Sequence, residues 1–294
     1  MLTSLHERAP RPAVRFSGVV NIVGTGGGPK TFNISTASAF VAAALGVRVV
    51  KTGSRAYSSR CGSMDLMQNL GIPLANSYEQ IEEMLERFGI ACAGYFIYPA
   101  ELSLLAKSIL PFDMRVVGRF VNSIGPFLAD IPISAQLTGV SDHALLPSLR
   151  SLADLADRRI WLCANECGAD ELISFSNNVI HPNGAEADIQ LSPNALGLGT
   201  GTMTDLRPVA DGAPVVEHFL ARLSGDGPRA ALQTIWLNAA ALAVLSRTVD
   251  DWSTALQAAR EVIEQGAVTR LVNQIRNHAA RVSISMVNGA PSHA

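Results

Sequence analysis

A glycine-rich turn between an apolar segment and a helix-forming segment constrains this chain more than any other feature. Residues 19–23 are largely apolar and β-branched, which predicts a buried strand, and four of the next five residues are glycine. An alanine- and leucine-rich stretch with helical composition begins after residue 33. A second apolar run at 47–51 predicts another strand, which ends in the polar turn 52–55. The order strand, glycine turn, helix, strand predicts an α/β domain.

This pattern is typical of a site for a phosphate-like anion. Glycine has no Cβ, so its backbone N–H can approach an oxyanion closely, and a helix N-terminus adds unpaired donors and partial positive charge. Lys51 adds a full charge at the end of a predicted strand, where open α/β sheets bind their ligands. The alternative is a tight turn without a ligand. Two polar turns after two consecutive strands favour the anion site.

The turn matches neither of the two common nucleotide-binding signatures. A Walker A loop ends in Gly-Lys-Ser/Thr, whereas Pro29, Lys30 and Thr31 follow the glycines here. The dinucleotide fingerprint needs a third glycine at the position that Pro29 occupies. The sequence therefore indicates a different kind of phosphate ligand.

Composition excludes several classes of protein. Of the 294 residues 48% are hydrophobic and 16% charged, and the net charge of −2 offers no field that attracts nucleic acid or an anionic membrane. The four cysteines lack the spacing of a disulfide framework or a zinc site, which favours buried thiols in a reducing cytoplasm. The N-terminus has no apolar segment of a secretion signal, and the apolar helix expected near 232–245 is interrupted by polar residues.

The remaining pattern predicts a mostly parallel central sheet flanked by helices. Segments 90–97, 135–140, 159–164, 171–176 and 186–190 read as strands, and a turn is expected at 122–126. Helices are expected at 64–70, 78–88, 99–110 and 142–156, and from 214 to the end. Residues 1–17 are predicted to be a flexible segment.

Several short motifs, in this order and at nearly this spacing, resemble those of the anthranilate phosphoribosyltransferase family. They are Gly24-Thr25-Gly26-Gly27, Asn33-Ile34-Ser35-Thr36, the Lys51-Thr52-Gly53-Ser54-Arg55 turn, Asn122-Ser123-Ile124-Gly125-Pro126, Gly168-Ala169-Asp170-Glu171-Leu172 and Leu237-Asn238-Ala239-Ala240. Together they span roughly residues 19–280.

The resemblance implies the nucleoside phosphorylase/phosphoribosyltransferase class of fold. Residues 18–294 would be an α/β domain that binds phosphoribosyl pyrophosphate (PRPP), with a reduced small helical subdomain at about 99–125. The implied reaction is Mg²⁺-dependent transfer of the phosphoribosyl group from PRPP to an acceptor, with release of pyrophosphate. The protein would be cytoplasmic and a homodimer, with no nucleic acid or membrane partner.

The resemblance also implies which residues form the site. Those expected to bind PRPP are Gly24, Thr25, Gly26, Gly27, Asn33, Ser35, Thr36, Lys51, Ser59 and Ser63. Those expected to hold Mg²⁺ are Ser35, Asp170 and Glu171, and the catalytic residues would be Lys51, Asp170 and Glu171. The acceptor would meet Thr52, Ser54, Tyr98 and Asn122.

Departures from the family pattern predict a changed acceptor. Gly28 replaces an Asp, Thr52 and Ser54 replace the His and Asn of the lysine turn, and Cys61 replaces a Ser. Near Ile109 an apolar residue stands where the family places the Arg that grips the anthranilate carboxylate. We therefore expect an aromatic or heteroaromatic acceptor other than anthranilate, in specialised metabolism.

Two other functions fit part of the pattern. A nucleoside phosphorylase-like enzyme shares the fold but lacks the acidic pair. A non-catalytic homologue that binds a ligand or nucleic acid would explain the drift at several motif positions, although a nucleic-acid binder should carry a basic stripe.

Overall fold

The computed structural model describes residues 15–53, 62–99, 101, 114–210 and 213–288. Within them, seven strands form one sheet in the order β3-β2-β1-β4-β5-β6-β7. The strands are β1 (Phe16–Gly24), β2 (Arg48–Lys51), β3 (Ile90–Cys92), β4 (Ile133–Gly139), β5 (Arg159–Asn165), β6 (Asn178–Pro182) and β7 (Ile189–Leu191). The pairs from β3 to β5 are parallel, and β6 and β7 add an antiparallel edge. The predicted mostly parallel α/β fold is confirmed.

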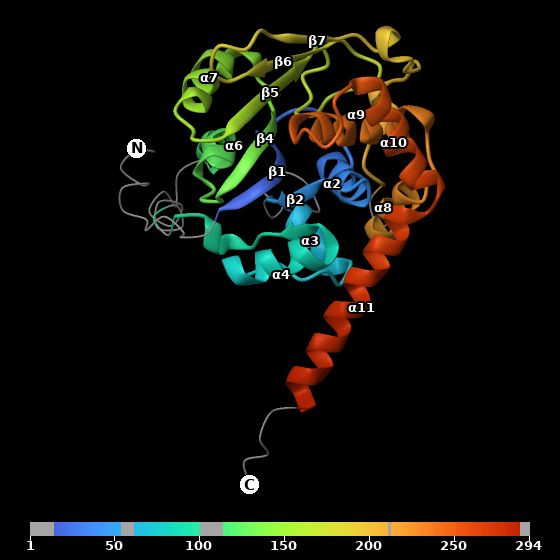
Figure 1. Ribbon diagram of the computed structural model, residues 1–294. Helices are drawn as coiled ribbons and strands as arrows, with labels where there is room; N and C mark the ends of the chain where they lie inside the picture. The colour runs from blue at the N-terminus through green and yellow to red at the C-terminus, as the bar shows by residue number, and fades with distance from the viewer. Residues whose placement is uncertain (1–14, 54–61, 100, 102–113, 211–212, 289–294) are drawn as a thin grey trace.

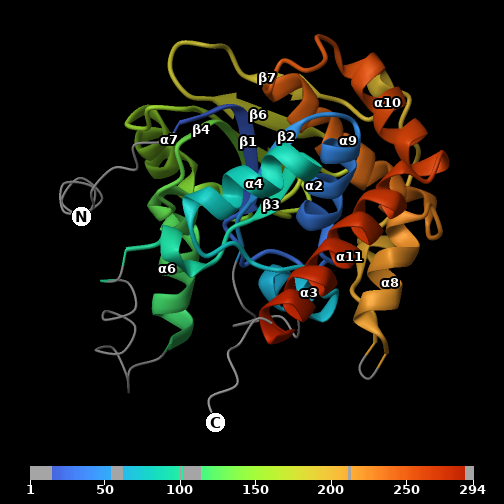
Figure 2. The ribbon, with the colours of Figure 1, turned by 60° about the horizontal axis from the view of Figure 1, so that its bottom comes forward.

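Helices cover both faces of this sheet (Figures 1 and 2). α6 and α7 lie on one side, and α2 with the C-terminal helices α8 to α11 gathers on the other. The helices are α2 (Ile34–Ala44), α3 (Ser63–Asn69), α4 (Tyr78–Phe88), α6 (Met114–Leu128), α7 (Leu146–Asp154), α8 (Val215–Leu223), α9 (Arg229–Leu245), α10 (Trp252–Glu264) and α11 (Ala267–Asn288). Short 3₁₀ turns lie at Tyr95–Ile97, His143–Leu145, Asn194–Leu196 and Met203–Leu206.

The alanine content of α2 and α9 follows from where they pack. α2 packs against both the sheet and α9, and nine of its eleven residues are buried. A helix enclosed on nearly every side needs small side chains so that its neighbours can approach closely. The first turn of α2 is thereby fixed beside the end of β1.

Three predicted elements differ from the structure. Residues 171–176 form an irregular loop, because their buried backbone groups bond to side chains rather than to a neighbouring strand. The turn expected at 122–126 is the end of α6, which includes Pro126. Gln136 and Arg158 donate hydrogen bonds to the Pro126 carbonyl, at 3.1 and 3.2 Å, and so satisfy one of the main-chain acceptors at the end of the helix. The strand expected at 90–97 ends at Cys92 and gives way to a 3₁₀ turn.

The N-terminal segment and the segment after residue 99 lie largely outside the described residues. Residues 1–17 were predicted to be flexible, but β1 includes Phe16 and Ser17, and residues 1–14 lie outside the described part. Most of the helix expected at 99–110 also lies outside it.

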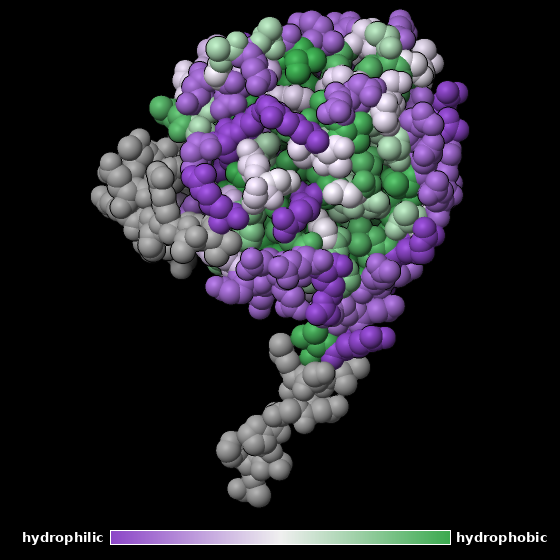
Figure 3. All heavy atoms as spheres, viewed as in Figure 1, coloured by the Kyte–Doolittle hydropathy of each residue, from purple (hydrophilic) through white to green (hydrophobic). Residues whose placement is uncertain are grey.

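α11 extends away from the body (Figure 1). None of the described helices is long and apolar enough to span a membrane. On the face of the protein that is viewed in Figure 1, hydrophilic residues form the periphery and apolar residues gather toward the centre (Figure 3).

Candidate active site

The glycine turn lies at the topological switch point of the sheet. β1 has β2 on one side and β4 on the other, and open parallel sheets bind ligands beside the C-terminal ends of such strands. Gly24 is the last residue of β1. Gly26 and Gly27 have φ angles of 67° and 84°, in the left-handed region that glycine adopts without strain. The turn predicted to bind an anion is therefore where the fold favours a ligand.

Residues from two other elements hold this turn. Ser141, which follows β4, donates from Oγ to the Gly26 carbonyl at 2.5 Å and from its backbone N–H to Thr25 Oγ1 at 3.3 Å. The Thr25 N–H in turn donates to the Gly139 carbonyl at 2.9 Å. From α6, the Asn122 amide nitrogen lies 3.6 Å from the position that a Cβ on Gly26 would take. The conformation of the turn is thus set by long-range contacts.

Asp170, from the loop after β5, reaches the same turn. The Gly26 N–H donates to Asp170 Oδ2 at 2.8 Å. A Cβ on Gly24 would lie 2.0 Å from this oxygen, so any side chain there would displace the carboxylate. The end of β1 and the loop after β5 therefore form a single site.

Glu171 lies beside Asp170 with incomplete hydrogen bonding. Thr31 donates to Glu171 Oε1 at 3.3 Å, whereas the buried Oε2 receives no hydrogen bond from any residue in the described ranges. Burial and the neighbouring Asp170 carboxyl raise the pKa of Glu171 well above its ordinary value. Burial also raises the pKa of Asp170, although the Gly26 N–H opposes this shift. The protein thus holds two carboxyl groups together where their charges are costly.

This acidic pair fits a hard divalent cation. Mg²⁺ prefers oxygen ligands and is commonly held by one or two carboxylates together with substrate phosphates. A cation would compensate the buried Glu171 Oε2. The parts of the chain that the structure describes contain no cluster of three or more His, Cys, Asp or Glu side chains that could hold a metal. The pair would therefore leave most of the coordination sphere to water or a ligand.

Lys51 ends β2 and is buried at the same edge of the sheet. Its ammonium group donates to the Thr52 carbonyl. Burial lowers the pKa of Lys51 from 10.5 to about 8, against the opposing effect of the acidic groups of Cys92, Asp170 and Glu171. The cation and the two carboxyl groups therefore interact within one partly desolvated site.

The N-terminus of α2 supplies hydroxyl and main-chain donors. α2 begins after Asn33, whose side chain makes no capping hydrogen bond, and its first turn has no acidic residue. Ser35 is half-buried. Thr36 is fully buried, and its Oγ1 has no hydrogen-bond partner among the described residues. The positive end of the helix dipole and an unpaired hydroxyl suit a phosphate group.

The turn after β2 approaches α3 closely. A Cβ on Gly53 would lie 1.8 Å from Ser63 Oγ and 3.9 Å from Lys51 Nζ, so Ser63 belongs to the neighbourhood of the lysine. Ser54 and Ser59, predicted to contact the acceptor and PRPP, lie outside the described residues.

Two of the residues predicted to bind the acceptor lie together. Thr52 is buried, and the Asn21 amide donates to its Oγ1 at 2.9 Å and accepts from its N–H at 3.2 Å. Burial raises the pKa of Tyr98 to about 12, and the neighbouring Thr52 side chain opposes this shift. Asn122 instead lies over Gly26.

Sequence reasoning missed Thr31, Ser141 and Asn21. Thr31 follows the glycine turn closely and Ser141 directly follows a predicted strand. Because open parallel sheets bind ligands beside the C-terminal ends of their strands, both could have been predicted. Asn21 is a single polar residue within an apolar run, and only the tertiary structure reveals its contact with Thr52.

Gly28, one of the departures from the family pattern, is closely packed against two other loops. A Cβ there would lie 2.6 Å from the Gly168 carbonyl oxygen and 3.0 Å from Ser141 Cβ. We expect Gly28→Ala to lower the free energy of unfolding by about 1–3 kcal/mol and to weaken ligand binding, because the two loops must separate.

Gly125→Ala is the matched control, since open space surrounds that helical position. It should be neutral or slightly stabilising. Thermal unfolding of both variants tests this, and equal stability would contradict it.

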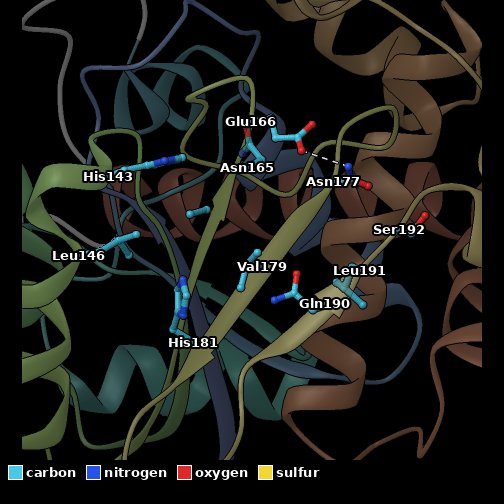
Figure 4. Close-up of a pocket in the computed structure, with 11 residues that line it drawn as sticks. His143, Leu146, Asn165, Glu166, Asn177, Val179, His181, Gln190, Leu191 and Ser192 are labelled. Atoms are coloured by element: carbon cyan, nitrogen blue, oxygen red, sulfur yellow. Dashed lines mark hydrogen bonds between the residues drawn. The ribbon is translucent and has the colours of Figure 1, made fainter.

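A separate cavity of about 360 Å³ lies on the outer face of β5 to β7 (Figure 4). His143, His181, Gln190 and Ser192 line it, and a hydrogen bond of 3.1 Å joins Asn177 to Glu166 at its edge. It contains none of the residues predicted to bind PRPP, the metal or the acceptor.

Comparisons with known proteins agree with this geometry. Residues 17–269 match the family model described as the glycosyl transferase family, a/b domain. The chain is 32% identical to the anthranilate phosphoribosyltransferase of Hydrogenovibrio crunogenus, over 87% of this chain and 75% of the relative. It is 33% identical to that of Cenarchaeum symbiosum, over 93% and 80%. The chain belongs to the anthranilate phosphoribosyltransferase family. The predicted enzyme class, a pentosyltransferase of the glycosyltransferases, is confirmed.

Solved structures of this family share the fold. The anthranilate phosphoribosyltransferase of Thermus thermophilus superposes with a TM-score of 0.78 at 25% identity, over 95% of this chain and 83% of that one. The Saccharomyces cerevisiae enzyme, solved in complex with PRPP and Mg, gives 0.76 at 21% identity, over 95% and 78%. The predicted family is thereby confirmed in both sequence and fold.

Proposed function

We propose that the protein is a Mg²⁺-dependent anthranilate phosphoribosyltransferase. The amino nitrogen of anthranilate forms a bond to C1 of PRPP, the bond from C1 to the pyrophosphate oxygen breaks, and the amine loses a proton. The observation that carries this proposal is the acidic pair held against the glycine turn, with the Gly26 N–H on Asp170 and Glu171 Oε2 unpaired among the described residues. The names of the relatives support the same reaction.

In this proposal the protein acts mainly by positioning and electrostatics. The turn from Gly24 to Gly27 and the start of α2 bind the phosphates of PRPP, and Lys51 neutralises charge on the leaving pyrophosphate. Asp170 and Glu171 hold the divalent cation. When bound, Mg²⁺ would supply further charge neutralisation at the leaving group. The yeast relative was solved in complex with PRPP and Mg. Residues 18–294 form the unit that binds PRPP.

Anthranilate is the acceptor that the comparisons support. The sequence-based expectation of another acceptor finds no support in them, because the relatives are anthranilate phosphoribosyltransferases and the yeast relative was also solved with 4-fluoroanthranilate. The apolar segment on which that expectation depended lies outside the described residues. Thr52 and Tyr98 form the acceptor side of the site in this proposal. The expected homodimer stays a prediction.

The other two functions find less support. The acidic pair distinguishes this site from a phosphorylase, which does not need a cation for its phosphate substrate. A net charge of −2 does not favour nucleic acid.

The test is to incubate the purified chain with PRPP, Mg²⁺ and anthranilate and to follow both pyrophosphate release and the loss of anthranilate fluorescence. We expect stoichiometric formation of phosphoribosyl anthranilate, abolished by EDTA and restored by Mg²⁺. Other aromatic amines and a nucleoside panel serve as comparison substrates. Faster turnover of another amine would contradict the acceptor assignment, and an absence of pyrophosphate release with every acceptor would contradict the enzyme itself.

A further inference from the structure

The loop that contains the acidic pair is held by buried asparagine side chains. It follows β5 without regular secondary structure, so its buried N–H and C=O groups need other partners. Asn165 at the end of β5, Asn178 at the start of β6 and Asn238 in α9 provide them, and all three side chains are buried. Asn165 and Asn178 border the loop in the sequence, whereas Asn238 comes from a distant helix. The structure therefore fixes the loop at both of its ends and by one long-range contact.

Asn165 holds the chain before and at the acidic pair. Its Oδ1 accepts hydrogen bonds from the N–H groups of Cys167 at 3.0 Å and Ala169 at 3.2 Å. Its Nδ2 donates to the carbonyl groups of Ala169 at 2.9 Å and Glu171 at 2.7 Å. One side chain thus satisfies main-chain groups on both sides of Asp170.

Asn238 holds the chain immediately after the pair. Its Oδ1 accepts from the Leu172 N–H at 3.0 Å, and its Nδ2 donates to the Leu172 carbonyl at 2.8 Å and to the Thr234 carbonyl of its own helix at 2.8 Å. Because α9 packs against α2, the asparagine connects the acidic pair to the helix that begins at the proposed phosphate site. Asp170 and Glu171 therefore lie between two fixed points of the backbone.

Such fixation has a physical consequence for a cation site. Two neighbouring carboxylates repel each other, and a mobile loop would let them turn apart toward solvent. Resting on the proposed function, we propose that Asn165 and Asn238 are positioning residues that hold the backbone of Asp170 and Glu171 in the geometry that binds the divalent cation. The cation then binds without first having to order the loop.

Asn178 provides a matched control within the same loop. Its Oδ1 accepts from the Ile173 N–H at 2.7 Å, and its Nδ2 donates to the carbonyl groups of Ile173 at 3.0 Å and Ser176 at 2.7 Å. It is buried like Asn238 and makes the same number of hydrogen bonds, but it holds the chain one residue farther from the pair. Asn178→Ala and Asn238→Ala should therefore lose similar stability, but only Asn238→Ala should weaken cation binding.

The experiment measures Mn²⁺ binding to the full chain by electron paramagnetic resonance, without PRPP, together with the thermal unfolding of each variant. We expect Asn165→Ala and Asn238→Ala to weaken Mn²⁺ binding about tenfold or more, as for other residues that orient metal ligands. Asn178→Ala should bind Mn²⁺ within about twofold of the wild type. The Mg²⁺ concentration for half-maximal turnover should rise in the first two variants, and excess Mg²⁺ should restore much of their rate. Asn238→Ser, whose hydroxyl can still bond to the Leu172 backbone, should give an intermediate affinity. It replaces the alanine variant if that variant does not fold.

The outcomes separate this inference from the proposed function. Equal Mn²⁺ affinity of Asn238→Ala and Asn178→Ala at equal stability would overturn the positioning role and leave the enzyme assignment intact. A wild-type chain that turns over PRPP but binds no Mn²⁺ in its absence would also overturn it. A wild type that neither binds Mn²⁺ nor releases pyrophosphate would overturn both.

Discussion

Lys51→Met is expected to abolish tight PRPP binding while leaving the folded protein at least as stable as the wild type. Methionine has a similar length but no charge, so it removes both the electrostatic contact with pyrophosphate and the cost of burying an ammonium group. A loss of about 3 kcal/mol, the upper range for a hydrogen bond to a charged group, corresponds to a rise of roughly a hundredfold in the Kd for PRPP. Calorimetric titration with PRPP and Mg²⁺ measures this.

The stability change should depend on pH in a defined direction. Folding lowers the pKa of Lys51 from 10.5 to about 8, because burial disfavours its ammonium group. The free energy of unfolding is therefore highest above pH 10.5, where the amine is neutral in both states, and it falls as the pH falls through about 8. Lys51→Met should therefore gain most stability below pH 8 and little near pH 10.5. Lys30→Met, at an exposed position, is the control and should change neither stability nor PRPP affinity by more than a few-fold. Equal effects of the two variants would contradict the site assignment.

Glu171→Gln is expected to reduce turnover on the order of 10²–10³-fold, because a neutral amide supports a divalent cation poorly. The same change should stabilise the protein without metal. Burial raises the pKa of Glu171 in the folded state, so the stability that its protonated form provides is present below the unfolded pKa and is lost as the pH rises through the folded value. The melting temperature of Glu171→Gln in EDTA should accordingly exceed that of the wild type at pH 8 and match it near pH 4.

Glu166→Gln is the control for this prediction. Glu166 lies in the same loop but is exposed and bonded to Asn177, so its amide variant should retain activity and show no comparable gain in stability. Activity that survives in Glu171→Gln with an unchanged Mg²⁺ requirement would show that the pair does not hold the cation.

The part of the site near the glycine turn could be predicted because its signals are local. A β-branched run, a glycine cluster and an alanine-rich helix stand next to one another in the sequence, and the turn, α2 and β2 form where these patterns indicate. Lys51 was found by the same reasoning, since it ends a strand of a parallel sheet.

The remainder depended on contacts that no local pattern reveals. Residues 171–176 resemble a strand because Leu172 and Ile173 are apolar and buried, yet the side chains of the distant Asn238 and the nearby Asn178 satisfy their backbone groups. Pro126 suggested a turn, but side chains from β4 and its surroundings complete the end of α6 instead. The packing of Gly28 against Gly168 was likewise invisible without the fold.

Binding of PRPP tests the central claim most directly, because every proposed role depends on one anion site formed by the ends of β1 and β2, α2 and the acidic pair. Calorimetry of the wild-type chain with PRPP should show saturable binding at one site in the presence of Mg²⁺ and much weaker binding in EDTA. Absence of saturable binding under both conditions, in a folded protein, would contradict the account.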